Sequence, residues 1–231
     1  MRNKIDFFLP TRKGSQRVIN KNTKPFANIE GGILELKLRQ LLNSKRIDRV
    51  LLSTNDEESI KIAHSIDPNS CKINVIVRPE YLCLDTTNLV DLINYVPTIT
   101  NADHILWGHV TTPFADASDY DNAIDVYFEK INNGFDSLVS VTPFKNFLFN
   151  KAGEIINNSS NIKWPRTQDL TPLLELNHAM FITSKIIYEQ KNNRVGDKPY
   201  FHEMEKLKSI DIDWEDDFKI AEMIYEKFIT V

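Results

Sequence analysis

A cluster of basic residues near the start of the chain is the clearest candidate for chemistry. Between Asp6 and Glu30 the sequence has no acidic residue, and five cations fall inside that interval: Arg12, Lys13, Arg17, Lys21 and Lys24. Cationic side chains on a loop suit a polyphosphate, because they offset its charge and donate hydrogen bonds to its oxygens. The same composition also fits a solvated basic loop, so the cluster alone leaves both interpretations open.

A second candidate lies near the other end of the chain, where Asp211 and Asp213 flank Ile212. We expect a strand at 207–212, and on a strand residues i and i+2 face the same way, roughly 7 Å apart. Two carboxylates on one face can hold Mg²⁺, which takes few carboxylates together with phosphate oxygens and water. Ordinary surface acids at a strand edge would give the same pattern, so this interpretation also stays open.

Two of the five histidines stand where they could contact a ligand. His109 follows an expected strand and His178 begins another, which places both at the rim where parallel sheets bind their ligands. The other three, His64, His104 and His202, are isolated and fit structural or exposed positions. No local pattern indicates a Ser/His/Asp nucleophile.

Composition excludes several other chemistries. The seven glycines contain no G-x-G pair and none precedes a lysine, so the dinucleotide fingerprint and the P-loop are both absent. Cys71 and Cys83 have no His/Cys partners at zinc-ligand spacing, and so few cysteines fit a reducing cytoplasm. A formal net charge of -4 argues against nucleic acid as a partner. The sequence has no apolar run of roughly 20 residues that would indicate a membrane helix, so we expect a soluble, cytoplasmic protein.

Apolar runs of strand length alternate with helical patterns along the chain, and this order predicts the fold class. We expect strands at 5–9, 49–53, 73–77, 104–107, 137–141, 178–182 and 207–212. We expect helices at 33–42, from 55 onward, and at 87–96, 118–130 and 215–229. The prediction is an α/β, Rossmann-like single domain over 1–231, with a mainly parallel sheet and helices on both faces. The pattern breaks at 143–177, which we interpret as an arm that leaves the sheet after the fifth strand and packs on another subunit.

The basic loop also resembles a known family. Residues 10–18, P-T-R-K-G-S-Q-R-V, with Lys21-Asn22, resemble the opening P-x-R-x-G-S-[KQ]-R-[LIV]…K-N of the acylneuraminate cytidylyltransferases, the CMP-sialic acid synthetases. Four further segments resemble that family in the same order: 51–57, 78–86, 166–170 and 211–217. Nearly the whole chain is covered; the opening motif is specific, and the others support it together.

The resemblance implies an enzyme that couples CTP to a 3-deoxy-2-ulosonic acid of the sialic-acid-like nonulosonic type. The anomeric hydroxyl of the acid would attack the α-phosphorus, and pyrophosphate would leave. The resemblance also implies a homodimer, Mg²⁺ as cofactor on Asp211 and Asp213, and catalytic roles for Arg12, Lys21 and Asp211. The implied nucleotide-binding residues are Arg12, Ser15, Arg17, Lys21, Asn22, Arg78, Asp85, Thr86 and Thr87. The implied acceptor-binding residues are His109, Thr111, Lys145, Arg166, Gln168, Asn177 and His178.

Two departures from the family pattern lie on the acceptor side. His109 stands where the family has glutamine, and His178 stands in the position of the glycine in N-G-A. The nucleotide motif is intact, so the donor is better determined than the acceptor, for which legionaminate- or pseudaminate-like acids fit as well as N-acetylneuraminate. Two alternatives remain: a nucleotidyltransferase that uses a sugar 1-phosphate or a Kdo-type acceptor, and a non-catalytic nucleotide-binding module.

Overall fold

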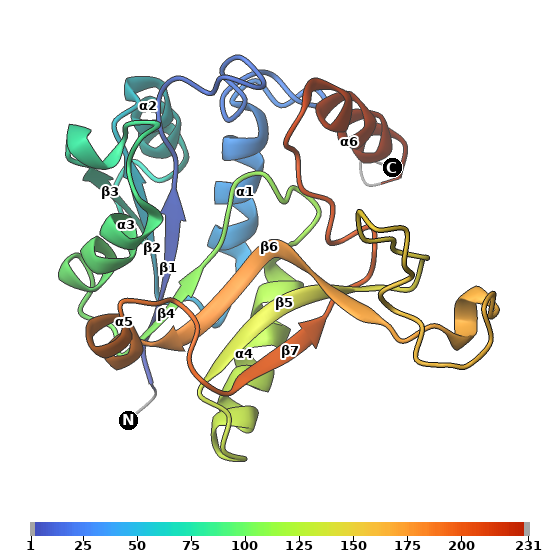
Figure 1. The fold of residues 1–231 in the computed structure, drawn as a ribbon. Helices are drawn as coiled ribbons and strands as arrows, with labels where there is room; N and C mark the ends of the chain where they lie inside the picture. Colours follow the sequence, from blue (N-terminus) through green and yellow to red (C-terminus); the bar gives the residue numbers. More distant parts are fainter. Residues whose placement is uncertain (1–2, 229–231) are drawn as a thin grey trace.

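A seven-stranded sheet with the order β3-β2-β1-β4-β6-β5-β7 forms the centre of the molecule (Figure 1). The computed structural model describes residues 3–228. The strands are β1 (Ile5–Pro10), β2 (Arg49–Thr54), β3 (Ile73–Val77), β4 (His104–Trp107), β5 (Ser137–Phe144), β6 (Leu173–Ser184) and β7 (Pro199–Glu203). Neighbouring strands are parallel except where β6 pairs antiparallel with β4 and β5. The predicted mainly parallel sheet is therefore confirmed.

Helices cover both faces of the sheet, as predicted. They are α1 (Gly32–Asn43), α2 (Glu57–Ile66), α3 (Leu89–Tyr95), α4 (Ala117–Ile131), α5 (Lys185–Lys191) and α6 (Glu215–Phe228), with short 3₁₀ turns η1 (Glu80–Leu82), η2 (Val96–Thr98) and η3 (Thr167–Asp169). Because side chains alternate along a strand, Phe7 of β1 packs in the core with α1, α2, α4 and α6, whereas Phe8 packs in a second core with α3 and α5. None of the helices within residues 3–228 has the length and apolar character needed to span a bilayer.

The long loop after β1 is anchored on the start of α1. Gly32 has φ +62°, and a Cβ there would lie 2.2 Å from the Lys24 carbonyl oxygen, so only glycine allows this close approach. The Leu34 amide then donates to the Asn22 carbonyl oxygen at 2.9 Å. These contacts hold the basic loop above the carboxyl end of β1.

One sequence-based expectation about the second half of the chain is wrong, and one strand there was not expected. Residues 207–212 form turns and irregular backbone rather than a strand, and the last strand is Pro199–Glu203, which pairs with β5. The apolar residues Leu207, Ile210 and Ile212 suggest a strand, but this segment crosses from β7 to α6. Its Ile212 amide donates to the Thr111 carbonyl oxygen at 2.8 Å instead of joining the sheet.

Other differences concern element boundaries. The helix α4 begins at Ala117, one residue before the expected start at 118, because Asp116 is its N-cap and forms a reciprocal capping box with Asp119. The strand expected at 178–182 is part of the longer β6, and α5 was not expected. The last helix begins at Glu215 as predicted and is described to Phe228; the expected final residue, Ile229, lies outside the described residues.

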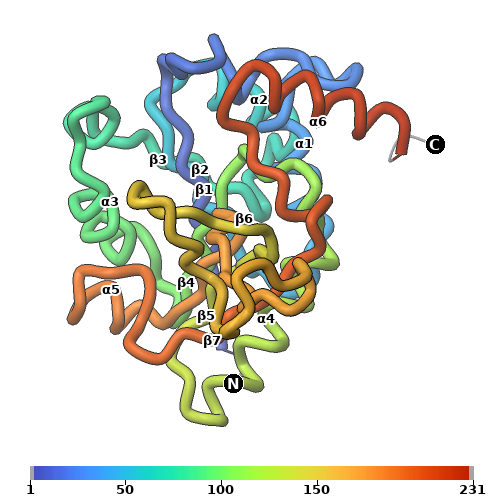
Figure 2. The backbone as a smooth tube through the Cα atoms, turned by 45° about the vertical axis from the view of Figure 1, so that its right-hand side comes forward, coloured from blue at the N-terminus to red at the C-terminus, as the bar shows by residue number. Residues whose placement is uncertain are grey.

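The segment between β5 and β6 extends away from the sheet in Figure 1, and in Figure 2, where that side of the molecule is turned forward, it lies in front of the sheet. The segment is shorter in sequence than the predicted 143–177, because β5 and β6 stay paired as far as Phe144 and Leu173. We refer to residues 145–172 as the arm. It has little regular structure, with one isolated bridge between Phe149 and Ile155 and the turn η3.

Candidate functional site

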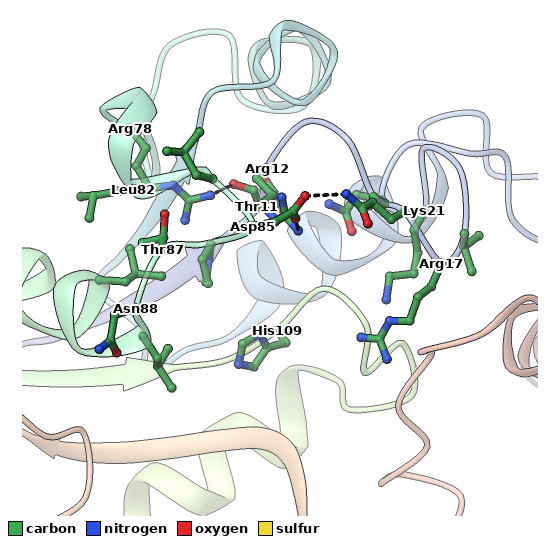
Figure 3. Close-up of a pocket in the computed structure, with 18 of the residues that line it drawn as sticks. Thr11, Arg12, Arg17, Lys21, Arg78, Leu82, Asp85, Thr87, Asn88 and His109 are labelled. Carbon is green, nitrogen blue, oxygen red and sulfur yellow. Dashed lines mark hydrogen bonds and ion pairs between the residues drawn. The ribbon is translucent and has the colours of Figure 1, made fainter.

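A cavity of about 410 Å³ opens at the carboxyl ends of β1 and β4 (Figure 3). Three segments line it: the loop after β1 from Pro10 to Asn22, the segment from Arg78 to Leu92, and Trp107 with His109 at the end of β4. Ligands of parallel α/β sheets bind at this edge. The fold thus brings the basic loop together with residues about 70 and 90 positions further along the chain.

Asp85 joins the two sides of the cavity at its centre. Its carboxylate accepts hydrogen bonds from the Arg12 guanidinium and from the Gln16 amide (Figure 3). A second Arg12 nitrogen donates to the Cys83 carbonyl oxygen at 3.3 Å. Donors that hold a carboxylate in this way can also hold phosphate oxygens. Gln16 belongs to the motif but was not among the predicted ligands, and its pairing partner 69 residues away gives no local signal.

Lys21 connects the basic loop with the predicted metal segment. It is 9% exposed, and its Nζ donates to the Ile212 carbonyl oxygen at 2.7 Å and lies 3.8 Å from an Asp213 carboxylate oxygen. Burial lowers the pKa of Lys21, and the neighbouring Asp213 and Asp211 oppose that change. Arg17 pairs with Asp213 at 2.7 Å and lies over the Trp214 ring. Residues from the two ends of the chain therefore form one charged edge of the cavity.

Arg78 forms the opposite wall and is almost completely buried. Its guanidinium donates to the Thr11 carbonyl oxygen and, at 3.2 Å, to the Cys83 sulfur. Because these contacts occupy its guanidinium, Arg78 supports the wall of the cavity. The apolar side chains of this wall include Leu82, Leu84, Leu89 and Leu92. Thr87 and Asn88 contribute polar groups, whereas Thr86 is outside the set of described residues that line the cavity. This wall has the mixed character that a nucleobase requires.

Asp211 and Asp213 lie on an irregular segment and not, as expected, on a strand. Neither is among the described residues that line the cavity, and Asp213 is linked to it through Arg17 and Lys21. Burial raises the pKa of Asp211, against a hydrogen bond from Thr111. Within residues 3–228, the Asp211 Oδ1 is buried without a hydrogen-bond partner. In the same described range no three His, Cys, Asp or Glu side chains gather as a metal site. A pair of carboxylates with one free oxygen nevertheless fits Mg²⁺, which completes its shell with phosphate and water.

A bulge in β6 shapes the acceptor side. The register with β5 shifts between Val139 and Val141, and at this point His178 has φ +59°. The buried Ser140 hydroxyl donates to the Asn177 side-chain oxygen at 2.6 Å and accepts from the Met180 amide at 2.8 Å. The predicted ligand Asn177 therefore uses its side chain inside the sheet, where it positions its neighbour. An imidazole in left-handed backbone is strained, and such strain concentrates at functional sites.

His109 and His178 come together at the end of β4. Their ring centroids are 5.9 Å apart, with the rings nearly perpendicular. Burial lowers the pKa of His109 to about 3, and the nearby charges of Arg194, His178 and Lys21 act in the same direction. Its Nε2 is buried and has no partner in the described part of the chain. A neutral imidazole both donates and accepts, so this pair suits hydroxyl or amide groups of a sugar.

The three predicted acceptor ligands on the arm lie elsewhere in the single chain. Lys145, Arg166 and Gln168 are exposed and do not line the cavity. Arg166 pairs with Asp169 on its own turn at 2.8 Å. Their contact with an acceptor requires a second subunit and stays a prediction.

Comparison with known proteins agrees with this geometry. A family model described as cytidylyltransferase matches residues 7–230. The N-acylneuraminate cytidylyltransferase of Escherichia coli O18:K1:H7 (strain RS218 / NMEC) is 28% identical over 98% of this chain, which covers only 53% of that longer protein. The post-translational flagellin modification protein B of Campylobacter coli is 22% identical over 94% of this chain and 92% of its own length.

The fold also has relatives of known structure. The structure of a CMP:2-keto-3-deoxy-manno-octonic acid synthetase complexed with CTP superposes on this chain with a TM-score of 0.64. The match covers 96% of this chain and 98% of the other. The two sequences are 11% identical, so this likeness concerns the fold alone. The chain spans about half the length of the Escherichia coli relative and almost all of the Campylobacter one.

Proposed function

Because the chain belongs to the cytidylyltransferase family, we propose that it transfers CMP from CTP to a 3-deoxy-2-ulosonic acid of the nonulosonic type and releases pyrophosphate. The observation that carries this proposal is the cavity edge at which Lys21, Arg17 and Asp213 meet. A cationic loop facing a carboxylate pair is what a metal-bound triphosphate requires. A module that only binds nucleotide has no need of that pair.

The proposed roles on the nucleotide side follow from position and charge. Arg12 and Gln16 exchange the Asp85 carboxylate for phosphate oxygens, while Ser15 and Asn22 on the same loop donate to them. Lys21 lies at the end of the loop, beside the two aspartates, and stabilises the charge that develops on the α-phosphoryl group. The wall built by Arg78 receives the cytosine.

The reaction is a direct displacement. The anomeric hydroxyl oxygen of the acceptor forms a bond to the α-phosphorus, the bond from that phosphorus to the bridging oxygen of pyrophosphate breaks, and the hydroxyl proton passes to water. Positioning of the two substrates and offsetting of charge provide most of the rate enhancement in such a step. Asp211 and Asp213 would hold Mg²⁺, which supplies charge to the phosphates and lowers the pKa of a bound hydroxyl.

We propose that the acceptor lies against His109, His178 and Thr111. The neutral His109 and the strained His178 are this chain's substitutes for a glutamine and a glycine of the family pattern, so they are expected to select the acceptor's substituents. The candidate acceptors, N-acetylneuraminate and the legionaminate-like and pseudaminate-like acids, would be distinguished by the groups that meet these two rings. Legionaminate-like and pseudaminate-like acids are the first to test.

A homodimer is part of the proposal, supported by the arm's exposed apolar side chains: Phe149, Ile156, Ile162 and Trp164. Apolar groups gathered on one projecting segment mark a contact surface. Lys145, Arg166 and Gln168 would approach the cavity of the partner. Sedimentation equilibrium of the whole chain tests this point, and a monomer at micromolar concentration would contradict it.

The experiment that tests the function is pyrophosphate release from CTP and Mg²⁺ with a panel of acceptors. The panel contains sialic, legionaminic, pseudaminic and Kdo-type acids, and a sugar 1-phosphate. Release with one nonulosonic acid supports the proposal and identifies the acceptor. Release with the Kdo-type acid or the sugar 1-phosphate alone would replace the acceptor class, and binding of CTP without any release would indicate a non-catalytic module.

A further inference from the structure

A buried arginine without a counter-ion lies next to the cavity. Arg194, in the loop between α5 and β7, is 8% exposed, and its guanidinium carbon is 3.8 Å from the Phe181 ring centroid and 4.7 Å from that of Trp107. Within residues 3–228 no carboxylate pairs with it, and its Nη1 is buried without a hydrogen-bond partner. Burial lowers its pKa to about 10, so the side chain remains charged at neutral pH.

Two more buried donors surround this cation. The Trp107 Nε1 and the Tyr188 hydroxyl are both without a hydrogen-bond partner among the described residues. Trp107, Phe181 and Tyr188 belong to one apolar cluster, and Arg194 and Tyr188 are close enough for each to affect the pKa of the other. Buried hydrogen-bond donors are almost always paired in proteins. Several unpaired donors in one place therefore indicate that a group which accepts hydrogen bonds is missing.

The aromatic rings explain only part of the arginine's presence. A cation over two ring faces recovers some of the energy lost on leaving water. An unpaired buried charge still costs stability, and an apolar side chain of similar size would fill the same space without that cost. Packing alone therefore does not account for an arginine here.

The position of the cluster identifies the source of the missing acceptor. Trp107 belongs both to this cluster and to the cavity wall, beside His109. The charge of Arg194 reaches the cavity, since it lowers the pKa of His109. Trp107 therefore contacts the guanidinium and also lines the cavity, so the charge of Arg194 lies behind a side chain that a ligand at the end of β4 would touch.

We propose that Arg194 binds the carboxylate of the acceptor sugar acid and so selects an acidic acceptor. The inference rests on the proposed function and adds a residue to it: the anchor for the acid lies in the same subunit as the nucleotide site. A guanidinium can bind both carboxylate oxygens in a fixed orientation, which also orients the neighbouring anomeric centre. Trp107 and Tyr188 supply the remaining donors.

Two substitutions separate binding from packing. Arg194→Met keeps the apolar contact with Trp107 and Phe181 but removes the charge, whereas Arg194→Lys keeps the charge and removes the planar fork. For Arg194→Met we expect KM for the acid to rise by roughly 30- to 100-fold, with KM for CTP unchanged, and Arg194→Lys to lie between it and the wild type. The melting temperature of Arg194→Met should rise by roughly 2–4 °C, because an unpaired buried charge is removed.

A neutral analogue and a surface variant complete the design. The carboxamide of the acceptor is tested as a competitor: the wild type should prefer the acid strongly, and Arg194→Met should bind acid and amide equally. Arg39→Met, which removes an exposed arginine paired with Glu35 on α1, should change neither KM.

The outcomes distinguish a failure of this inference from a failure of the proposed function on which it rests. If the wild type releases pyrophosphate and Arg194→Met keeps the wild-type KM for the acid, the anchor is disproved and the function stands. Equal losses of acid and amide binding, or a lower melting temperature, would indicate a structural arginine and also overturn the inference. If none of the acids in the panel supports pyrophosphate release by the wild type, both proposals fail.

Discussion

The nucleotide side and the acceptor side of the cavity are built in different ways. On the nucleotide side, one continuous loop after β1 supplies Arg12, Gln16 and Lys21, all anchored on the start of α1. On the acceptor side, His109 comes from the end of β4, His178 from a bulge in β6, and Arg194 from the loop after α5. The phosphate-binding part of the nucleotide side is therefore local in sequence, whereas the acceptor side is assembled from distant segments.

The difference shows why the two sides carry different amounts of information in the sequence. A loop that binds phosphate needs donors at fixed spacing along one stretch of backbone, so its pattern is visible as a motif. A sugar subsite needs only that several side chains converge, and many different segments can satisfy that demand. The two halves should therefore respond differently to substitution.

The largest effect is expected at the point where the nucleotide loop meets the acidic segment. Lys21→Met removes the buried cation beside the reacting phosphoryl group, and we expect turnover to fall by roughly 10²–10³-fold. The matched control is Lys24→Met, because Lys24 lies on the same loop but pairs with Glu215 at 2.7 Å. Pyrophosphate release measures both. Near wild-type turnover of Lys21→Met would remove the lysine from the mechanism.

A loss of roughly 10²-fold is expected for Asp211→Asn, with a higher Mg²⁺ concentration needed for half-maximal rate. The amide retains the shape of the side chain but not its charge, so the fold should persist. Asp216→Asn, an exposed acid on α6, is the control. A titration of rate against Mg²⁺ decides the matter, and superimposable curves for Asp211→Asn and the wild type would exclude a metal ligand.

A smaller and one-sided effect is expected at the bulge. His178→Gly should raise KM for the acceptor about tenfold and leave KM for CTP unchanged, since only the acceptor side is altered. The same change relieves left-handed strain, so the free energy of unfolding should rise by about 1 kcal/mol. Ser70→Gly, also at positive φ but in the loop before β3, should gain stability without any change in KM. A parallel rise in KM for CTP would mean that the two sides are not independent.

The smallest effect on turnover is expected where α1 supports the loop after β4, between the nucleotide side and the acceptor side. Lys37 of α1 is fully buried and donates to the carbonyl oxygens of Thr112 and Ala115 and to the Tyr120 hydroxyl, and thereby supports the loop after β4. Burial lowers its pKa to about 7, opposed by Asp119 and Asp116 and reinforced by Lys208. The unfolded chain, whose lysine has a pKa of about 10.4, therefore binds more protons above pH 7.

Stability should thus rise with pH through this residue. Relative to Lys37→Met, the free energy of unfolding of the wild type should increase by about 1 kcal/mol between pH 7 and pH 8. Urea denaturation of both proteins at several pH values measures the difference. A constant difference over that range would show that Lys37 keeps an ordinary pKa in the folded protein.

Much of the first half of the fold is predictable from the sequence. Apolar runs predict β3 and β4 to the residue, and β1 and β2 to within one residue. For the central strands β1, β2 and β4 the reason is that helices cover both faces of the sheet, so these strands are apolar on both faces. The second half is harder to predict. Residues 207–212 look like a strand because they contain three apolar residues, while the true β7, with the sequence P-Y-F-H-E, is a half-exposed edge strand that shows little apolar pattern.

The sequence by itself determined the α/β class, the loop that carries Arg12 and Lys21, and the candidate acids Asp211 and Asp213, because each depends on residue types along a short stretch of chain. Only the tertiary structure decided what those residues face. The contact of Lys21 with Ile212, the bulge at His178 and the unpaired charge of Arg194 all depend on pairings between segments far apart in the chain. Such pairings follow from packing of the whole sheet, which no local pattern encodes.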